Sequence, residues 1–296
     1  MGKKKPSSKA KNTLKNKGKA NKPIKRDGSR PLHGARGKDP RGYGGDDRQS
    51  QNLTPAHKDG FFLHGRHAIT AALQNPKRKC LRLFATSKSA EDARELLDIR
   101  PELDIFMVQD STIENVVGFD SPHQGLLMDV LPLPDAGHLE ILEPKANQKN
   151  IILMLDQVTD PHNVGACMRS AAAFGARALI TQDRNSPMES GVLARASSGA
   201  LELLPWLRLP NLSQALDALK EMGYWSMGLD GNTEQTLSGL NLGDNVVIVM
   251  GSEGKGLRPL VAKHCDVIAR IPMTDTIESL NVSNAAAIAL YEVGMR

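Results

Sequence analysis

Residues 151–169 read IILMLDQVTDPHNVGACMR and decide the class of fold. Their first five residues form an unbroken apolar run, which is typical of a strand buried on both faces of a parallel sheet. A polar loop follows, and the pattern after it predicts a helix over residues 163–174. A buried strand that leads through a short loop into a helix indicates an α/β fold.

The same alternation continues to the end of the chain. It predicts further strands at residues 178–181, 246–250 and 267–271 and further helices at residues 212–222 and 280–293. Elements of this type and length predict a mainly parallel sheet covered by helices on both faces. Ligands of such sheets bind beyond the carboxyl ends of the strands, so the loops after residues 155, 250 and 271 are candidate binding loops.

A smaller α/β unit is predicted upstream. Strands at residues 61–63, 81–85, 105–108 and 126–131 alternate with helices at residues 67–73, 90–97 and 112–117. Prolines and polar residues then interrupt the periodicity. We therefore expect a first domain over residues 59–132, a linker over residues 133–149 and a second domain over residues 150–296.

The positive charge is concentrated at the beginning of the chain. Residues 1–50 hold 16 Lys and Arg against four acidic residues, a net charge of +12, whereas the other 246 residues have a net charge of −7. Residues 1–58 contain few large apolar side chains, so we expect a disordered basic arm. Such an arm is suited to RNA phosphates, and the alternative is a tail that only improves solubility.

Three observations exclude other classes of protein. Cys80, Cys167 and Cys265 lack the spacing of a disulfide framework or a zinc site, so no metal is expected and a reducing compartment fits. The chain begins without the apolar segment of a secretory signal and contains no apolar run long enough to span a membrane. We therefore expect a soluble, cytoplasmic protein.

The three candidate binding loops contain the most unusual stretches of the sequence. The second reads GSEGKGL over residues 251–257 and the third reads PMTDTIESLNVSN over residues 272–284. The second loop lacks the spacing of a Walker A loop, and its glycines run GxxGxG rather than GxGxxG. An NTPase or a dehydrogenase is therefore unexpected.

Together, the three loops resemble the motifs of the SpoU, or TrmH-like, family of RNA ribose methyltransferases, which belongs to the knotted SPOUT superfamily. Motif one is P-x-N-x-G-x-x-x-R from Pro161 to Arg169, motif two is residues 251–257, and motif three is residues 271–273 followed by SLNVS at residues 279–283. Residues 60–296 are similar to the family members that act on a guanosine of 23S rRNA. GRHA at residues 65–68, HQG at residues 123–125 and SSGALELLP at residues 197–205 add to this resemblance.

The resemblance implies a deep trefoil knot in the second domain, an L30e-like RNA substrate-binding fold in the first, and S-adenosyl-L-methionine as the cofactor. It implies that the backbone at Gly251, Ile271 and Leu280 surrounds this cofactor. It further implies a catalytic set made of Asn163, Arg169, Glu253, Ser279 and Asn281. Asn284 departs from the family pattern, because many relatives have a small aliphatic residue there.

The role of Arg169 stays open between two forms of catalysis. The family assigns this arginine to the ribose 2′-hydroxyl, often as the general base, but a guanidinium with a pKa above about 12 is a poor proton acceptor. A fixed cation that stabilises a developing alkoxide or grips a phosphate is the alternative. Without their companions, Asn163, Ser279 and Asn281 would be read as helix caps.

The expected function is methylation of a ribose 2′-hydroxyl in structured RNA, with 23S rRNA as the partner, and the resemblance also suggests a homodimer. The first alternative is the same reaction on tRNA. The second is a non-catalytic RNA-binding factor for ribosome assembly, which failure to bind S-adenosylmethionine would reveal.

Overall fold

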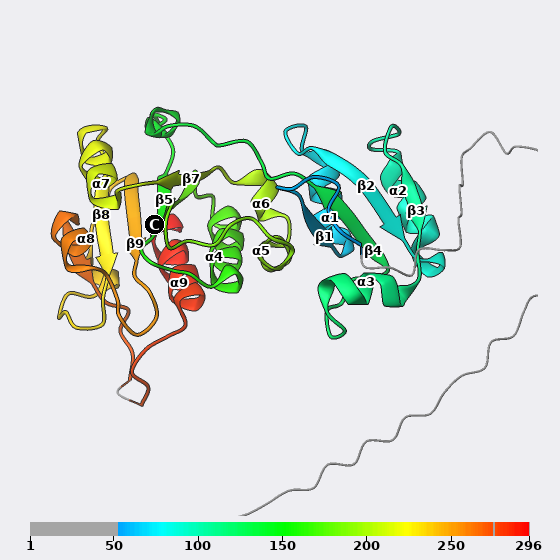
Figure 1. Cartoon of the computed structure of the whole chain (residues 1–296). Helices are drawn as coiled ribbons and strands as arrows, with labels where there is room; N and C mark the ends of the chain where they lie inside the picture. The colour runs from blue at the N-terminus through cyan, green and yellow to red at the C-terminus, as the bar shows by residue number, and fades with distance from the viewer. Residues whose placement is uncertain (1–52, 275, 296) are drawn as a thin grey trace, which may run out of the picture. The chain divides into compact units, whose positions relative to one another are not determined.

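The computed structural model describes residues 53–274 and 276–295. The basic arm expected over residues 1–58 therefore lies, up to residue 52, outside the described residues. The described part forms two β-sheets with their helices (Figure 1). We call residues 53–131 the first lobe and residues 150–295 the second lobe, and residues 132–149 connect them.

The first lobe is built on a four-stranded sheet in the order β1-β4-β2-β3. Strand β4 runs antiparallel to β1 and β2, whereas β2 and β3 are parallel. The strands are β1 (Phe61–His64), β2 (Cys80–Ala85), β3 (Ile105–Met107) and β4 (Leu126–Val130), and the helices are α1 (Arg66–Gln74), α2 (Ala90–Leu97) and α3 (Asp110–Val117). Each lies where the sequence pattern predicts it.

The second lobe is built on a six-stranded sheet in the order β10-β8-β9-β5-β6-β7, and all five strand pairs are parallel. The strands are β5 (Asn150–Leu155), β6 (Ala178–Gln182), β7 (Trp206–Leu209), β8 (Trp225–Leu229), β9 (Asn245–Met250) and β10 (Val267–Ala269). The helices are α4 (Pro161–Ala173), α5 (Gly191–Ser197), α6 (Ala200–Leu203), α7 (Leu212–Glu221), α8 (Pro259–His264) and α9 (Val282–Gly294). The predicted α/β fold with a mainly parallel sheet is confirmed.

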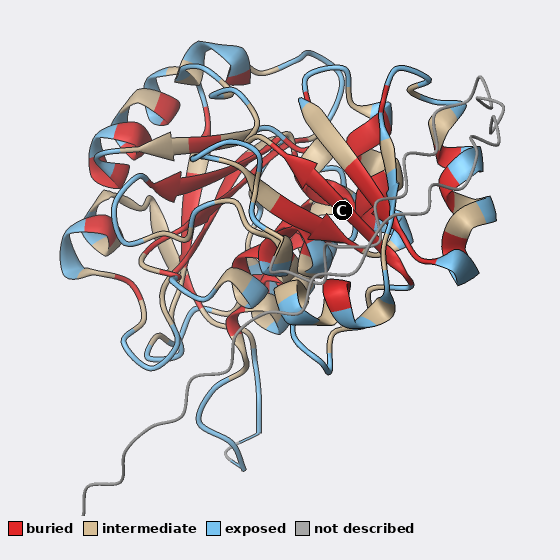
Figure 2. Ribbon diagram, turned by 45° about the vertical axis from the view of Figure 1, so that its right-hand side comes forward, coloured by how far each residue is buried: buried red, intermediate tan, exposed pale blue. Residues whose placement is uncertain are grey.

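Strand β5 is buried over its whole length and supplies side chains to two hydrophobic layers. Ile151 and Leu153 pack in a cluster with residues of α4 and α9, while Ile152 and Met154 pack in a second cluster with residues of α7 and α8. Alternate residues of a strand point to opposite faces, so this division places helices on both sides of the sheet. Figure 2 shows the buried strands between these layers.

The sequence prediction omitted β7, β8 and three short helices of the second lobe. Strand β7 lies at the edge of the sheet and is only partly buried, and β8 contains Ser226 and Gly228, so neither has the continuous apolar run of β5. The predicted helix at residue 280 begins at Val282, because Asn281 is its N-cap. The predicted strand 267–271 ends at Ala269.

The segment before β1 is fixed to the first lobe by a buried ion pair. The Asp129 side chain is fully buried and lies 2.6 Å from Nη2 of Arg82. Its Oδ2 also accepts a hydrogen bond from the backbone N–H of Ala56, and Arg82 donates to the carbonyl of Thr54. The chain therefore enters the first lobe along a defined path from Thr54 onward.

The described residues contain neither a membrane-spanning helix nor a cluster of metal ligands. Within that part of the chain, no helix has the length and hydropathy to cross a bilayer. No group of three or more His, Cys, Asp or Glu residues in the same part could hold a metal ion. All three cysteines are free.

His64 lies where β1 meets α5, and it is only 5% exposed. Neither ring nitrogen has a hydrogen-bond partner in the described structure. Burial lowers the pKa of His64 from 6.5 to about 4, and the nearby charges of Arg195 and His123 act in the same direction. His64 is therefore neutral when the protein is folded at neutral pH.

This histidine makes stability depend on pH. Between pH 6.5 and about 4 the unfolded chain binds a proton at His64 that the folded chain does not, so folding stability falls as the pH falls through this range. Between pH 7.5 and 5 we expect urea unfolding of the wild type to lose about 2 kcal/mol more than that of His64→Leu. His67→Gln, at an exposed site of the same lobe, should keep the wild-type slope. Equal slopes for wild type and His64→Leu would contradict the assignment.

Candidate cofactor pocket and active site

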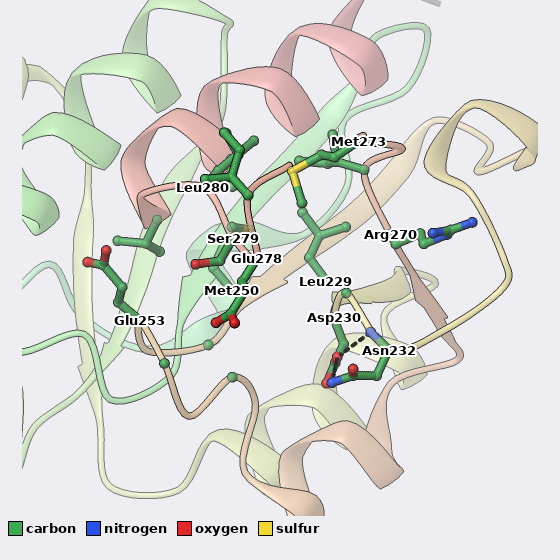
Figure 3. Close-up of a pocket in the computed structure, with 18 of the residues that line it drawn as sticks. Leu229, Asp230, Asn232, Met250, Glu253, Arg270, Met273, Glu278, Ser279 and Leu280 are labelled. Carbon is green, nitrogen blue, oxygen red and sulfur yellow. Dashed lines mark hydrogen bonds between the residues drawn. The ribbon is translucent and has the colours of Figure 1, made fainter. Parts of the chain in front are cut away.

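A pocket of about 590 Å³ opens at the carboxyl edge of the parallel sheet. The loops that follow β8, β9 and β10 form its walls, as expected for a parallel α/β sheet. Figure 3 shows Glu253 and Arg270 at opposite sides of the pocket in that view. Of the predicted site residues, five line it: Gly251, Glu253, Ile271, Ser279 and Leu280.

The glycine-rich loop after β9 folds tightly on itself. Ser252 and Gly256 pair through two backbone hydrogen bonds of 3.2 and 2.9 Å. A Cβ atom on Gly251 would lie 2.1 to 2.3 Å from the backbone of Gly256 and Leu257, so only glycine fits there. This closure leaves Glu253 exposed at the tip of the loop, on the pocket wall. The family resemblance implied that the backbone at Gly251 borders the cofactor, and the structure shows that a glycine is also required there by the close approach of Gly256 and Leu257.

Motif one begins helix α4 and meets motif three through a pair of asparagines. Asp160 caps the helix by accepting a hydrogen bond from the backbone N–H of His162. Asn163 accepts, through Oδ1, a hydrogen bond of 2.9 Å from Nδ2 of Asn281. Oδ1 of Asn281 accepts from the backbone N–H and the hydroxyl of Ser283, which caps α9. Asn281 is therefore both a helix cap and a support for Asn163.

Arg169 lies apart from the pocket. Its side chain is exposed, and it is not among the pocket-lining residues. Arg169 lies six positions after Asn163, which places the two side chains about 120° apart around α4. Within one chain, the structure therefore brings together Glu253 and Ser279 but not Arg169.

Asp156 and Arg258, for which the sequence pattern predicted no role, hold two motif loops together. Asp156 follows β5 and is fully buried. Its carboxylate accepts hydrogen bonds from Nε of Arg258 at 2.7 Å and from the backbone N–H of Arg258 at 3.0 Å. A buried charge needs a partner, so this pair fixes the end of the glycine loop against the start of motif one. The one signal in the sequence was an acidic residue directly after a buried strand.

The loop after β8 also supplies unpredicted residues to the pocket. Asp230 accepts hydrogen bonds from the backbone and side chain of Asn232, as Figure 3 shows. Arg270 lines the pocket too, and its buried Nε has no hydrogen-bond partner among the described residues. Asn284 is exposed and does not line the pocket.

The pocket, its glycine loop and the asparagine pair share the carboxyl edge of one parallel sheet. A parallel sheet with a pocket beyond its strand ends is typical of a ligand-binding α/β enzyme. The chain belongs to the SpoU rRNA Methylase family, which it matches over residues 150–291. Residues 62–136 match the RNA 2′-O ribose methyltransferase substrate binding family.

Individual relatives support this assignment. A 23S rRNA (guanosine-2′-O-)-methyltransferase, RlmB, of Pseudomonas putida is 35% identical over 234 residues, covering 78% of this chain and 94% of the relative. The enzyme with the same name from Neisseria meningitidis is 36% identical, covering 78% and 93%. The SpoU methyltransferase AviRb from Streptomyces viridochromogenes, crystallised with AdoMet, shares the fold with a TM-score of 0.70 at 22% identity, covering 80% and 90%.

Two substitutions of Asn281 separate its roles as a cap and as a support. Asn281→Ala should lose about 1 kcal/mol of stability with the cap, and should also lose activity. Asn281→Asp keeps an oxygen for Ser283 but cannot donate to Asn163. We expect it to unfold in urea within about 0.5 kcal/mol of the wild type while losing at least about tenfold in methyl transfer. Wild-type activity in Asn281→Asp would show that the asparagine pair has no role in the reaction.

Proposed function

We propose that this protein transfers a methyl group from S-adenosyl-L-methionine to a ribose 2′-hydroxyl of structured RNA, with a guanosine of 23S rRNA as the target. The observation that carries the proposal is the pocket lined by two of the family motifs and joined to the third by the Asn163–Asn281 hydrogen bond. The relatives whose names state this reaction align along almost their whole length. This supports the same reaction and the same substrate class for the present chain.

The residues of the pocket fit the proposed cofactor. Leu229, Met250 and Leu280 offer an apolar surface for the adenine ring. The carboxylates of Asp230, Glu253 and Glu278 suit the cationic groups of the cofactor. The bound cofactor supplies an electrophilic methyl group on a sulfonium. The backbone at Gly251, Ile271 and Leu280 would hold it, while Glu253 and Ser279 face the same space.

The RNA hydroxyl requires a second set of groups, which we place on motif one. Asn163 is held by Asn281, so its amide has a fixed orientation from which to position the ribose. Arg169 would act on the hydroxyl, either by accepting its proton or, as the permanent positive charge of a guanidinium favours, by stabilising the developing negative charge. The exposed position of Arg169 leaves it available to an RNA substrate.

We further propose that the active site is completed in a homodimer, since Arg169 does not line the pocket of its own chain. Helix α9 packs against α4 and exposes large apolar side chains at Ile288 and Tyr291, and its C-cap residue Met295 is exposed as well. Their spacing of three and four residues places them on one stripe of the helix. A second copy of the chain would cover this stripe and bring its own Arg169 to the pocket.

The remaining parts of the proposal concern the organisation of the chain. We assign the L30e-like substrate-binding domain to residues 59–132, the linker to residues 133–149 and the methyltransferase domain to residues 150–296. A trefoil knot is supported by the path of the chain, which leaves edge strand β10 and returns to pack α9 on the central strands β5 and β9. The basic arm would add contacts with RNA phosphates. We also propose that the enzyme works in the cytoplasm.

The direct test is methyl transfer from labelled S-adenosylmethionine to unmethylated 23S rRNA and to tRNA, with mapping of the 2′-O-methylated nucleotides. We expect one guanosine of 23S rRNA to be labelled, and we expect Arg169→Ala and Glu253→Ala to lose on the order of 100-fold in kcat. Lys220→Met, which removes the exposed lysine that pairs with Asp266, is the control. Labelling of tRNA alone would change the substrate, and failure to bind the cofactor or label either RNA would favour a non-catalytic assembly factor.

Mixing two inactive variants tests completion across the dimer. If Arg169 and Glu253 of one site come from different subunits, a heterodimer of Arg169→Ala and Glu253→Ala contains one intact site. Random exchange of subunits should then restore about a quarter of wild-type activity. If both residues serve the site of their own subunit, every site keeps one defect and the mixture stays inactive.

A further inference from the structure

The two lobes are joined by a buried cluster of charges at the turn between α1 and β2. The Arg78 side chain in this turn is fully buried. Its Nη1 lies 2.7 Å from a carboxylate oxygen of Glu189, and its Nη2 lies 2.7 Å from one of Glu202, so both acidic partners belong to the second lobe. The Glu202 side chain is 2% exposed and that of Glu189 is 12% exposed. One guanidinium thus holds two carboxylates from the other lobe.

The same cluster includes the connection between the lobes. Nη1 of Arg78 donates to the carbonyl of Leu131 at 2.8 Å, and Glu189 accepts a hydrogen bond of 3.0 Å from the backbone N–H of Leu133. The chain is therefore bonded to the first lobe at Leu131 and to the second lobe at Leu133, where the connecting segment begins. The prolines and polar residues of this segment had suggested only a linker, because a sequence pattern does not show what its backbone contacts.

The turn that carries Arg78 is itself braced. Arg100 donates hydrogen bonds to the backbone carbonyls of Leu73, Asn75 and Arg78. Asn75 in turn donates to the Glu202 carboxylate at 2.8 Å. A guanidinium that meets two carboxylates in a fixed geometry defines an orientation, which apolar contacts alone do not.

Close backbone contacts surround the cluster. A Cβ atom on Gly191 would lie 2.4 Å from the carbonyl oxygen of Phe62, and one on Gly199 would lie 3.1 Å from Cβ of Ala71. Both glycines belong to the second lobe, and both facing residues belong to the first. One cluster of buried apolar side chains also continues through both lobes. The junction leaves little room for the lobes to rotate.

We propose that Arg78 is a positioning residue that locks the RNA-binding lobe onto the methyltransferase lobe and so selects which ribose reaches the pocket. The inference rests on the proposed function, because the selection concerns its RNA substrate. Contacts between RNA and the first lobe persist without Arg78, whereas the fraction of bound RNA that presents the correct ribose falls. Loss of the lock therefore lowers kcat more than it raises KM for RNA.

The test uses two variants, because removing Arg78 alone leaves two buried carboxylates without a partner. The first is Arg78→Met. The second combines Arg78→Met with Glu189→Gln and Glu202→Gln, which removes the lock without leaving a buried charge. A matched control, Arg82→Met with Asp129→Asn, removes an arginine–carboxylate pair that lies wholly within the first lobe.

Spin labels report the orientation of the lobes independently of activity. Cysteines introduced at the exposed positions Lys88 and Glu221 place one label on each lobe. Burial raises the pKa of Cys80 to about 11 and that of Cys167 and Cys265 to about 12, so the native thiols react slowly with the label. With labelled subunits diluted in excess unlabelled protein, so that distances within one chain dominate, the full-length wild type and the control should show one narrow distance distribution. The triple variant should show one at least twice as wide.

Kinetics complete the test. In the triple variant we expect kcat on 23S rRNA to fall at least tenfold, while KM for RNA changes less than threefold. The affinity for S-adenosylmethionine should stay within twofold of the wild type. Additional nucleotides of the RNA should become methylated. An unchanged distance distribution would overturn the lock, and a broadened one with wild-type kcat and selectivity would overturn its positioning role. Absence of methyl transfer by the wild type would instead refute the proposed function, while the distances would still decide whether the lock exists.

Discussion

Complete burial of strand β5 is the constraint on which the rest of the structure depends. Its six residues are buried between β9 and β6, and they supply both hydrophobic layers of the second lobe. Because the neighbouring strands are parallel, β5 and β9 deliver their loops to the same edge. The charge at the end of β5, Asp156, is buried as well and therefore requires Arg258 from the loop after β9. The packing of one strand thus determines which two motif loops meet and how the glycine loop is closed.

The sequence predicted the helices and strands that have a strong local apolar pattern. It did not predict the strands whose position depends on contacts with neighbouring strands. Strands β5 and β9 and helices α4 and α9 have apolar patterns that suffice to locate them. Strands β7 and β8 lack such an apolar pattern. Strand β7 lies at the edge of the sheet and is only partly buried, and β8 contains small residues. The order of the six strands depends on contacts between segments far apart in the sequence, and no local pattern contains it.

The same distinction applies to the site. The glycine loop and the last motif were identified as binding loops, and Gly251, Glu253, Ile271, Ser279 and Leu280 line one pocket. Asp230 and Arg270 were missed because they follow β8 and β10, a strand that was not predicted and one that ended earlier than expected. Arg169 was correctly placed on α4, but its angular separation from Asn163 could be recognised only once the position of the pocket was known. The type of a residue indicates which chemistry its side chain can perform. The order of the strands in the sheet determines which side chains line the same pocket.

The junction between the lobes shows how charge and small residues act together. Apolar surfaces alone bring two lobes together but tolerate sliding, because the free energy depends on buried area rather than on direction. Gly191 and Gly199 allow the backbones to approach so closely that only a narrow range of orientations avoids a clash. Within that range Arg78 satisfies Glu189, Glu202 and the Leu131 carbonyl at once, and a small rotation would leave at least one buried charge unpaired. An orientation-dependent penalty of this kind suits an enzyme whose selectivity must come from the placement of a large RNA, since the 2′-hydroxyl itself is common to every nucleotide.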